Sequence, residues 1–193
     1  QLFEEDGVTP QYQNLDAQNA GNYFRTHSQI NWDAMYFANT TSANAGRSAY
    51  VLYEDRTDDN LLNANSIINS SLSDNITLNA RVNFRKLRSH NYQNLLDLLG
   101  GQYFLDVDAF YTGDAAQSDL NNPNRQVGEG DSYGYNYLLH ALTFDGFTQF
   151  KFSYDKVDFY LAQSFSRSEY QREGIYRNGI YANNSFGKGE SIT

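Results

Sequence analysis

The sequence predicts an all-β fold: an antiparallel transmembrane β-barrel, of which this chain forms a part, about four or more strands of a larger barrel, with long extracellular loops containing short helices. Three observations lead to this prediction. Several segments alternate strictly between apolar and polar residues, short polar turns separate these segments in pairs, and long polar segments flank the pairs. The alternation gives each strand one apolar face, which covers either the core of a soluble sandwich or the lipid of a membrane.

The clearest strand is "ITLNARVNFRK", Ile76 to Lys86. Its even positions from Ile76 to Phe84 are apolar, and its odd positions are Thr, Asn or Arg. Leu62 to Leu72 precedes it with a weaker form of the same parity, and the turn Ser73 to Asn75 consists of residues that favour tight turns. The two segments are therefore predicted to form a hairpin.

A second hairpin is predicted downstream. Leu142 to Tyr154 alternates with Phe147 as its exception, Asp155 and Lys156 form the turn, and Val157 to Tyr170 returns. From the shared parity we expect one set of residues to face lipid and another to face the lumen. The lipid-facing set is Ile76, Leu78, Val82, Phe84, Phe150, Phe152, Phe159 and Leu161, and the lumen-facing set is Asn79, Arg81, Asn83, Gln149, Lys151 and Asp158.

Long segments lie before, between and after the hairpins. Ser89 to about Tyr137 is predicted to be a loop with a short helix in "NYQNLLDLLGG", because four leucines precede the possible C-cap pair Gly100 and Gly101. Gln1 to Arg47 is predicted to hold a helix around "NWDAMYFANTT", and Gln171 to Thr193 reads as another loop. Short turns at one end and long loops at the other are typical of outer-membrane barrels.

Closing a barrel requires at least about 8 strands, so four strands are expected to belong to something larger. The chain begins and ends in predicted loops, which agrees with this expectation. Residues 1–193 are accordingly expected to be one part of a single barrel domain.

Composition limits the classes of function. The chain has 14 basic and 23 acidic residues, a net charge of −9, and no basic stripe that could neutralise the phosphates of a nucleic acid. It has no cysteine, which removes disulfides and thiolate chemistry. We therefore expect no nucleic-acid partner.

Several phrases carry a resemblance to a known family: "YVLYEDRTDDNLLNAN", "LLGGQYFLDVDAF", "YGYNY", "VDFYLAQSFSRSEYQREGIYRNG" and "NNSFGKGES". They resemble the barrel of TonB-dependent outer-membrane receptors of Bacteroidetes, the type with a carboxypeptidase-regulatory-like domain at the N-terminus. The resemblance covers about residues 46–193 and is loose before them. It implies location in the outer membrane and energised uptake of a ligand such as a glycan, peptide or metal complex. It also implies contact with outer-membrane lipid, with a TonB complex through a plug region, and with a surface lipoprotein partner. The plug, the N-terminal domain and most of the strands of that family are absent from this sequence.

The residues predict no enzyme: neither a triad-like nor a metal-spaced motif surrounds the three histidines, and no catalytic residue, metal ligand or cofactor is predicted. "DVDAFYTGD" places Asp106, Asp108 and Asp114 close in sequence, where they either bind a hard cation such as calcium or form a solvated acidic loop.

Aromatic residues outside the predicted strands are the candidate ligand-binding residues, because their rings stack on sugars or peptides. They are Trp32, Tyr36, Tyr103, Tyr111, Tyr133, Tyr135 and Tyr137. The alternative is that they form an interfacial girdle or pack the loops together. Two other functions also stay open: a surface-displayed barrel for adhesion or structural partnering, and a soluble all-β binding domain.

Overall fold

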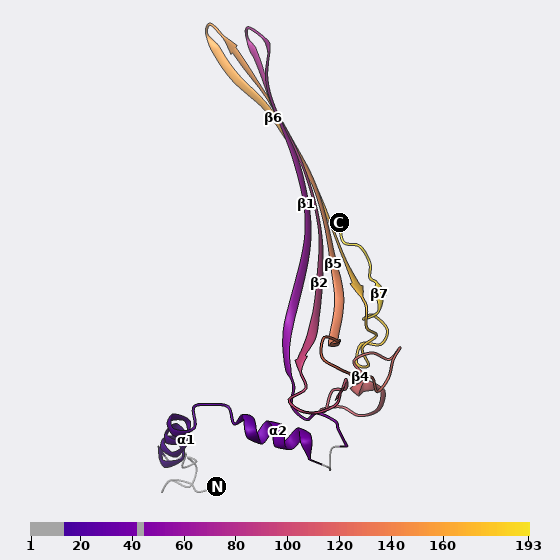
Figure 1. Ribbon diagram of the computed structural model, residues 1–193. Helices are drawn as coiled ribbons and strands as arrows, with labels where there is room; N and C mark the ends of the chain where they lie inside the picture. The colour runs from indigo at the N-terminus through magenta and orange to yellow at the C-terminus, as the bar shows by residue number, and fades with distance from the viewer. Residues whose placement is uncertain (1–13, 42–44) are drawn as a thin grey trace, which may run out of the picture.

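The computed structural model of the protein describes residues 14–41 and 45–193 and has an all-β architecture (Figure 1). One antiparallel sheet contains most of the strands, and a two-stranded sheet pairs β3 (Phe104–Leu105) with β4 (Gln126–Val127). The strands of the main sheet are, in sheet order, β1 (Leu52–Ser73), β2 (Ile76–Asp97), β5 (Ser132–Tyr154), β6 (Val157–Gly174) and β7 (Gly187–Lys188). Four of them form a long twisted blade with both tight turns at one end (Figure 1).

Both predicted hairpins are confirmed. Asp74 and Asn75 connect β1 to β2, and Asp155 and Lys156 connect β5 to β6. The strands are much longer than the sequence predicts, with 22, 22, 23 and 18 residues for β1, β2, β5 and β6. Polar cross-strand pairs extend them where the apolar alternation ends: Thr57 bonds Asn91 across β1 and β2, and the Tyr92 hydroxyl donates to Asp58 at 2.9 Å.

The helix predicted within Asn91 to Gly101 is wrong, because residues up to Asp97 belong to β2. That segment pairs with β1 on one side, as in Leu95 opposite Tyr53, and with β5 on the other up to Asn94. Leu95 is completely buried whereas Leu96 is 48% exposed, as expected for neighbours on opposite faces of a strand. Leu99 and Gly100 both have positive φ, so the glycine pair forms a turn after a strand and caps no helix.

Other predicted loops are also shorter than expected, because strands extend into them. Tyr133, Tyr135 and Tyr137 lie in β5, and the last predicted loop begins inside β6, which continues to Gly174. The predicted N-terminal helix is confirmed as α2 (Trp32–Thr40), and α1 (Asn14–Thr26) was not predicted. Residues 1–13 of the long N-terminal segment lie outside the described part of the chain. Neither described helix is long and apolar enough to cross a membrane.

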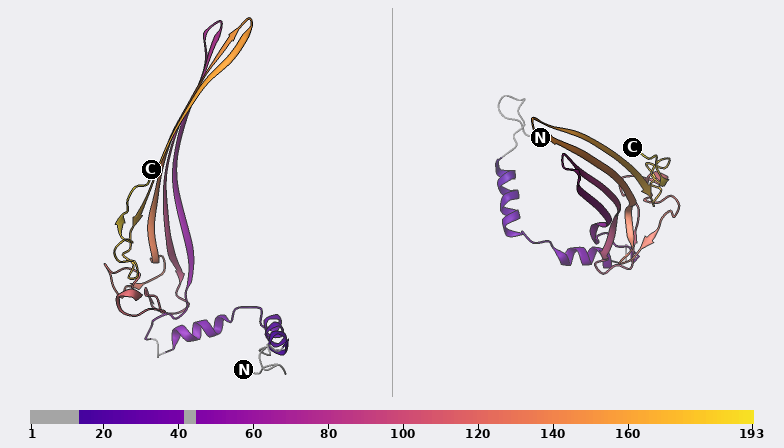
Figure 2. Two further views of the ribbon diagram at one scale, coloured as in Figure 1. Left: turned by 180° about the vertical axis from the view of Figure 1, so that it is seen from behind. Right: turned by 90° about the horizontal axis from the view of Figure 1, so that it is seen from above.

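The hydrophobic core lies at the foot of the sheet, away from the tight turns. It contains Leu95, Leu98, Val127 and Tyr133, with Val51 and Phe104 packed against them. By contrast, no residue of β1 and no residue of β2 before Ser89 is buried. Among the described residues no second layer covers either face of the long sheet, and α1 and α2 project sideways from its foot (Figure 2).

A buried amide attaches α2 to this foot. Asn39, 1% exposed, donates from Nδ2 to the carbonyl oxygens of Tyr50, Leu98 and Leu99, at 2.7, 2.8 and 3.2 Å. Its Oδ1 accepts hydrogen bonds from the backbone N–H groups of Ala49 and Tyr50. The helix is therefore bound to the end of β2 by polar contacts, which satisfy backbone groups that the sheet leaves unpaired.

Candidate functional site

The four long strands place their apolar residues in rows across one face of the sheet. Ile76 lies opposite Phe152, which lies opposite Phe159. The next row on the same face is Ser70, Leu78, Phe150 and Leu161, and later rows contain Val82 with Phe165 and Phe84 with Phe144. We call residues on this side of the strands the apolar face. All eight residues of the expected lipid-facing set lie on it, and their rings stack, as in Phe152 and Phe159 at 4.5 Å between centroids.

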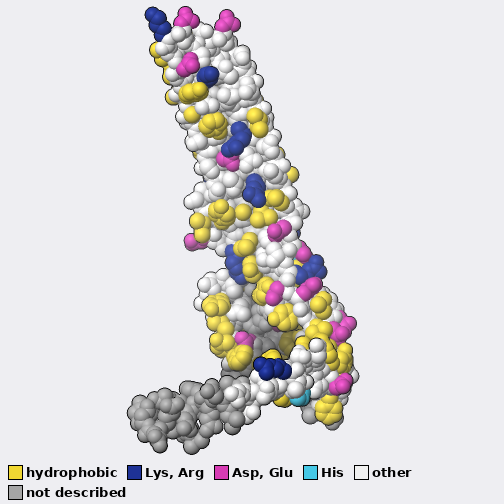
Figure 3. All heavy atoms as spheres, turned by 90° about the vertical axis from the view of Figure 1, so that its left-hand side faces the viewer, with side chains coloured by type: hydrophobic (Ala, Val, Ile, Leu, Met, Phe, Trp, Pro, Cys, Tyr) yellow, Lys and Arg dark blue, Asp and Glu magenta, His cyan; other side chains and the backbone are white. Residues whose placement is uncertain are grey.

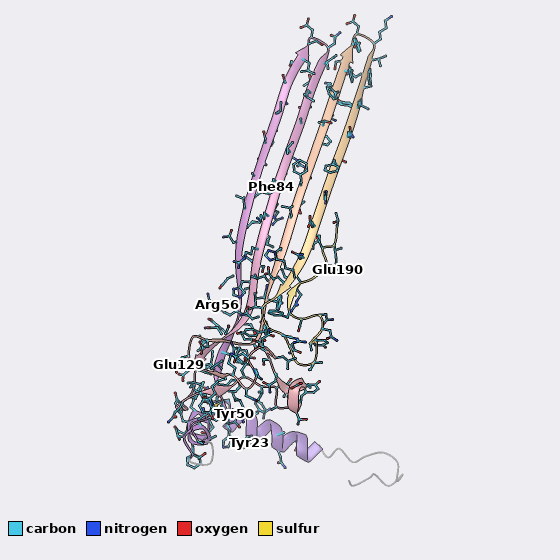
Figure 4. The ribbon with its side chains drawn as sticks, turned by 90° about the vertical axis from the view of Figure 1, so that its right-hand side faces the viewer. Tyr23, Tyr50, Arg56, Phe84, Glu129 and Glu190 are labelled. Atoms are coloured by element: carbon cyan, nitrogen blue, oxygen red, sulfur yellow. The ribbon has the colours of Figure 1, made fainter. Side chains whose placement is uncertain are left out.

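The opposite face, which we call the polar face, carries the whole expected lumen-facing set. Asn83 donates to Asp145 at 3.0 Å, and Arg81 lies 3.7 Å from the same carboxylate. Figure 3 shows one side of the blade, along which both hydrophobic and charged side chains are scattered. Figure 4 shows the molecule from the other side, with Phe84 labelled about halfway along the strands. No second packed sheet of this chain meets the apolar face in the described residues.

The apolar face has a defined length. From Ile76 to Phe84 the strand rises about 27 Å, and nine residues is the length of a strand that crosses a bilayer at a tilt near 45°. We call the rows from Ile76 to Phe84 the apolar band. The same face becomes charged from the last row of the band, which contains Arg167 on β6, and continues with Lys86 and Arg88 on β2 and Glu169 on β6.

Both edges of the sheet leave backbone groups without sheet partners in the described part of the chain. β1 pairs only with β2 along its 22 residues, and β6 pairs beyond β5 only through Glu173 and Gly174 with β7, plus an isolated bridge from Tyr170. A long bare edge is a template for another strand. In lipid, each unpaired N–H or C=O group of such an edge would carry a large free-energy cost.

At the foot of the sheet, a buried ion pair organises the irregular segments. Arg125 donates from Nη2 to Asp106 at 2.6 Å and to the carbonyl of Ser132 at 2.6 Å, and its guanidinium stacks on Tyr176. The second carboxylate oxygen of Asp106 accepts from the backbone N–H of Gly134. This cluster joins the β3–β4 segment, the start of β5 and the segment after β6.

The seven predicted aromatic residues do not form one site. Tyr133 is buried in the core, where its ring contacts Tyr53 and Phe104 edge-on and burial raises the pKa of its hydroxyl. Trp32 and Tyr36 lie on α2, Tyr111 is exposed in the segment after β3, and Tyr103 forms a bridge with Arg47 beside the foot. Packing, the alternative to ligand binding, is therefore the role that the geometry gives Tyr133.

Tyr135 and Tyr137 do come together, on the polar face. Their ring centroids are 5.8 Å apart, the Tyr135 hydroxyl donates to Asp55 at 2.9 Å, and Arg172 stacks on Tyr137. Burial, followed by the hydrogen bond from its hydroxyl to Asp55, raises the pKa of Tyr135 to about 12. Asp55 and Arg172 were not predicted as site residues, although the tyrosines at every second position of "YGYNY" already indicate a strand.

A hollow of about 250 Å³ lies beside the buried ion pair. Its walls include Phe104, Asp106, Gln117, Gly134, Asn178 and Ile180. The three carboxylates that could bind calcium do not converge there: Asp106 is paired with Arg125, Asp108 caps the N–H of Phe110, and Asp114 lies in the turn of helix 113–116. Within the described residues no group of three acidic, histidine or cysteine side chains is arranged to bind a metal ion.

Comparison with known proteins adds no assignment, because no family model matches the chain and searches of curated proteins and of solved structures found no match.

Proposed function

We propose that the chain is a section of the wall of an outer-membrane β-barrel, with its apolar band in lipid and its polar face toward a water-filled lumen. The observation that carries this proposal is the apolar face itself. Four strands present its apolar band in register over the length of one bilayer crossing, while no second layer of described residues covers that band. Neighbouring strands of a larger barrel would pair with the bare edges of β1 and β6.

Within that class, we propose a transporter of the TonB-dependent receptor type. The resemblance of the quoted phrases supports this choice, and so does the strand length, since 22 residues extend far beyond the 9–11 that cross a membrane. The extension and the segments at the foot would stand above the outer surface and surround the ligand path. Their acidic residues favour neutral or cationic ligands through repulsion of anions: Asp97, Asp108, Asp114, Asp119, Glu129 and Asp131. Asp106 lies in the same segment but is paired with Arg125.

The membrane assignment can be tested with single cysteines, because the chain has none of its own. Cysteines placed one at a time from Leu78 to Asn83 in the full-length protein are treated with a water-soluble maleimide in intact outer membranes. We expect labelling at the odd positions, which face water, and protection at Leu78, Ala80 and Val82, which face lipid.

Unfolding in detergent and denaturant should abolish the protection of these cysteines. That result would show that the protection arises from the membrane and the fold. Uniform labelling along the segment, or recovery of the full-length protein from the soluble fraction, would support the soluble binding domain instead. A plug domain encoded in the same gene would support a transporter, whereas a gene without one would support a barrel that only displays its loops.

A further inference from the structure

We propose that a cluster of three cations beside the apolar band, Lys86, Arg88 and Arg167, binds the phosphate of an anionic membrane lipid. The lipid belongs to the leaflet on the side of the long segments. This inference rests on the proposed position of the apolar band in a bilayer.

The three cations lie on the apolar face in three successive rows. Arg167 shares the row of Phe84 and Phe144, the last row of the apolar band. Lys86 is in the next row, opposite Leu142, and Arg88 in the row after it, opposite His140. The rows are about 7 Å apart, because side chains of one face recur every second residue. The cluster therefore begins where hydrocarbon would give way to headgroups.

These cations have no partner among the described residues, either in an ion pair or in a side-chain hydrogen bond. The carboxylates of the same face do have partners, including Asp58 on β1, which lies 3.2 Å from Arg56. Glu169 accepts a hydrogen bond from the hydroxyl of Ser191 at 2.7 Å, and Glu173 lies 2.9 Å from Nε2 of His140. In a chain with a net charge of −9, these three rows carry three cations and one carboxylate, Glu169, and so form a local positive patch.

A hollow of about 290 Å³ lies beside Lys86, which is the one of the three cations that lines it. Phe84, Leu142 and Ala141 supply apolar parts of its wall, and Lys86, His140 and Glu169 border it. A second hollow of about 220 Å³ lies deeper in the apolar band, where Gly146 leaves space between Val82 and Phe165. A Cβ atom added at Gly146 would come no closer than 3.9 Å to any atom outside its chain neighbours, so this space is open.

A phosphate-bearing lipid matches both features together. Its headgroup would accept hydrogen bonds from the lysine and arginine side chains, and an acyl chain would fill the apolar hollows. A soluble anion would gain only the charged contacts, and an apolar peptide only the hollows. Charge complementarity combined with adjacent apolar space therefore identifies a lipid as the occupant.

The test compares two charge-matched triple variants of the full-length protein. K86Q/R88Q/R167Q removes the patch, whereas R81Q/R85Q/K151Q removes three cations from the polar face of the same strands. Each protein is purified in detergent and titrated with palmitoyl-oleoyl phosphatidylglycerol or with phosphatidylcholine of the same chains, and bound lipid is counted by native mass spectrometry. Because each cation near a membrane surface contributes about a five-fold preference for anionic lipid, we expect the patch variant to lose about 100-fold in that preference. The control should retain it.

A further variant tests the apolar part of the site without changing charge. G146L fills the deeper hollow and should reduce the binding of both lipids while leaving the ratio between them intact. The proposal would be overturned if both triple variants lost the preference for phosphatidylglycerol equally. It would also be overturned if millimolar inorganic phosphate displaced phosphatidylglycerol. Either result could be explained without a lipid site at the patch. If the wild-type protein passes the cysteine test but binds both lipids equally, the lipid site is wrong and the proposed membrane position stands. If the cysteine test fails, both proposals are wrong.

Discussion

Nη2 of Arg125 lies 2.6 Å from Oδ2 of Asp106, and the Asp106 side chain is only 1% exposed. The same carboxylate accepts the backbone N–H of Gly134, so one buried charge fixes both the β3–β4 segment and the start of β5. The phenol of Tyr176 covers the guanidinium and donates to the Ser132 carbonyl at 2.8 Å. The foot of the sheet thus depends on a polar network as well as on its small hydrophobic core.

Removing the charge of Asp106 should therefore destabilise the foot. D106N leaves Arg125 without its counter-ion in a site shielded from water, and such losses cost about 3 kcal/mol. We expect faster proteolysis of residues 98–131 and a lower midpoint of chemical unfolding. D155N, in the exposed turn of the second hairpin, is the control and should change neither. Equal stability of D106N and wild type would mean that the ion pair contributes nothing.

Asn39 should be equally sensitive, for a different reason. N39L keeps the branched shape of the side chain but removes the hydrogen bonds of Asn39 to the backbone groups of Ala49, Tyr50 and Leu99, at a cost of about 1–3 kcal/mol for each group that water does not reach. Amide hydrogen exchange in α2 should accelerate. N19L on the exposed surface of α1 serves as the control, and unchanged protection in N39L would show that other contacts bind α2.

The sequence predicts the hairpins because their apolar residues alternate, and it fails where that alternation stops. Between Leu52 and Leu61 the strand consists mainly of charged and polar residues, and its pairing is visible only in cross-strand contacts such as Thr57 with Asn91. Such contacts depend on a register that no local pattern specifies. The leucines at 95, 96, 98 and 99 illustrate the same limit, since two adjacent pairs fit a helix stripe as well as they fit the end of a buried strand.

This ambiguity gives a sharp test with two neighbouring leucines. In a strand, Leu95 faces the core and Leu96 faces outward, so L95A should cost about 2–5 kcal/mol and L96A less than about 1 kcal/mol. In the amphipathic helix that the sequence predicts, neighbouring leucines would both face the core and cost similar amounts. Chemical unfolding of the two variants, followed by the fluorescence of Trp32, distinguishes the two cases.

The aromatic site on the polar face could likewise be predicted only in part from sequence. Tyr135 and Tyr137 could be chosen from sequence because they recur at every second position. Asp55 lies 80 residues before Tyr135, and Arg172 lies 35 residues after Tyr137. Both meet the tyrosines only through the register of the sheet. Tyr133, of the same parity, turns into the core because a bulge separates it from the regular pairing of β5 with β2. Parity alone cannot predict a bulge, which depends on how the foot packs.

The two faces of the sheet should respond differently to an added charge. V82R places a cation one row from the middle of the apolar band and should cost about 2–4 kcal/mol. F152R lies in the row of Ile76 at the end of the band and should cost less, and N83R on the polar face should be nearly neutral. Folding titrations of the full-length protein in lipid vesicles measure all three. Similar costs on the two faces would remove the assignment of the apolar band to lipid.

The orientation of the sheet gives the last prediction. If the protein is an outer-membrane barrel, its short turns face the periplasm and its long segments face the outside of the cell. A short epitope inserted between Phe110 and Tyr111, beside a side chain that is 94% exposed, should bind antibody on intact cells. The same epitope between Asp74 and Asn75 should bind only after the outer membrane is permeabilised, because that turn joins β1 to β2 at the opposite end of the blade. Total epitope measured in lysed cells controls for the amount of each protein. Labelling of both sites on intact cells would show that the two ends lie on the same side of the membrane, which a membrane-spanning sheet does not allow.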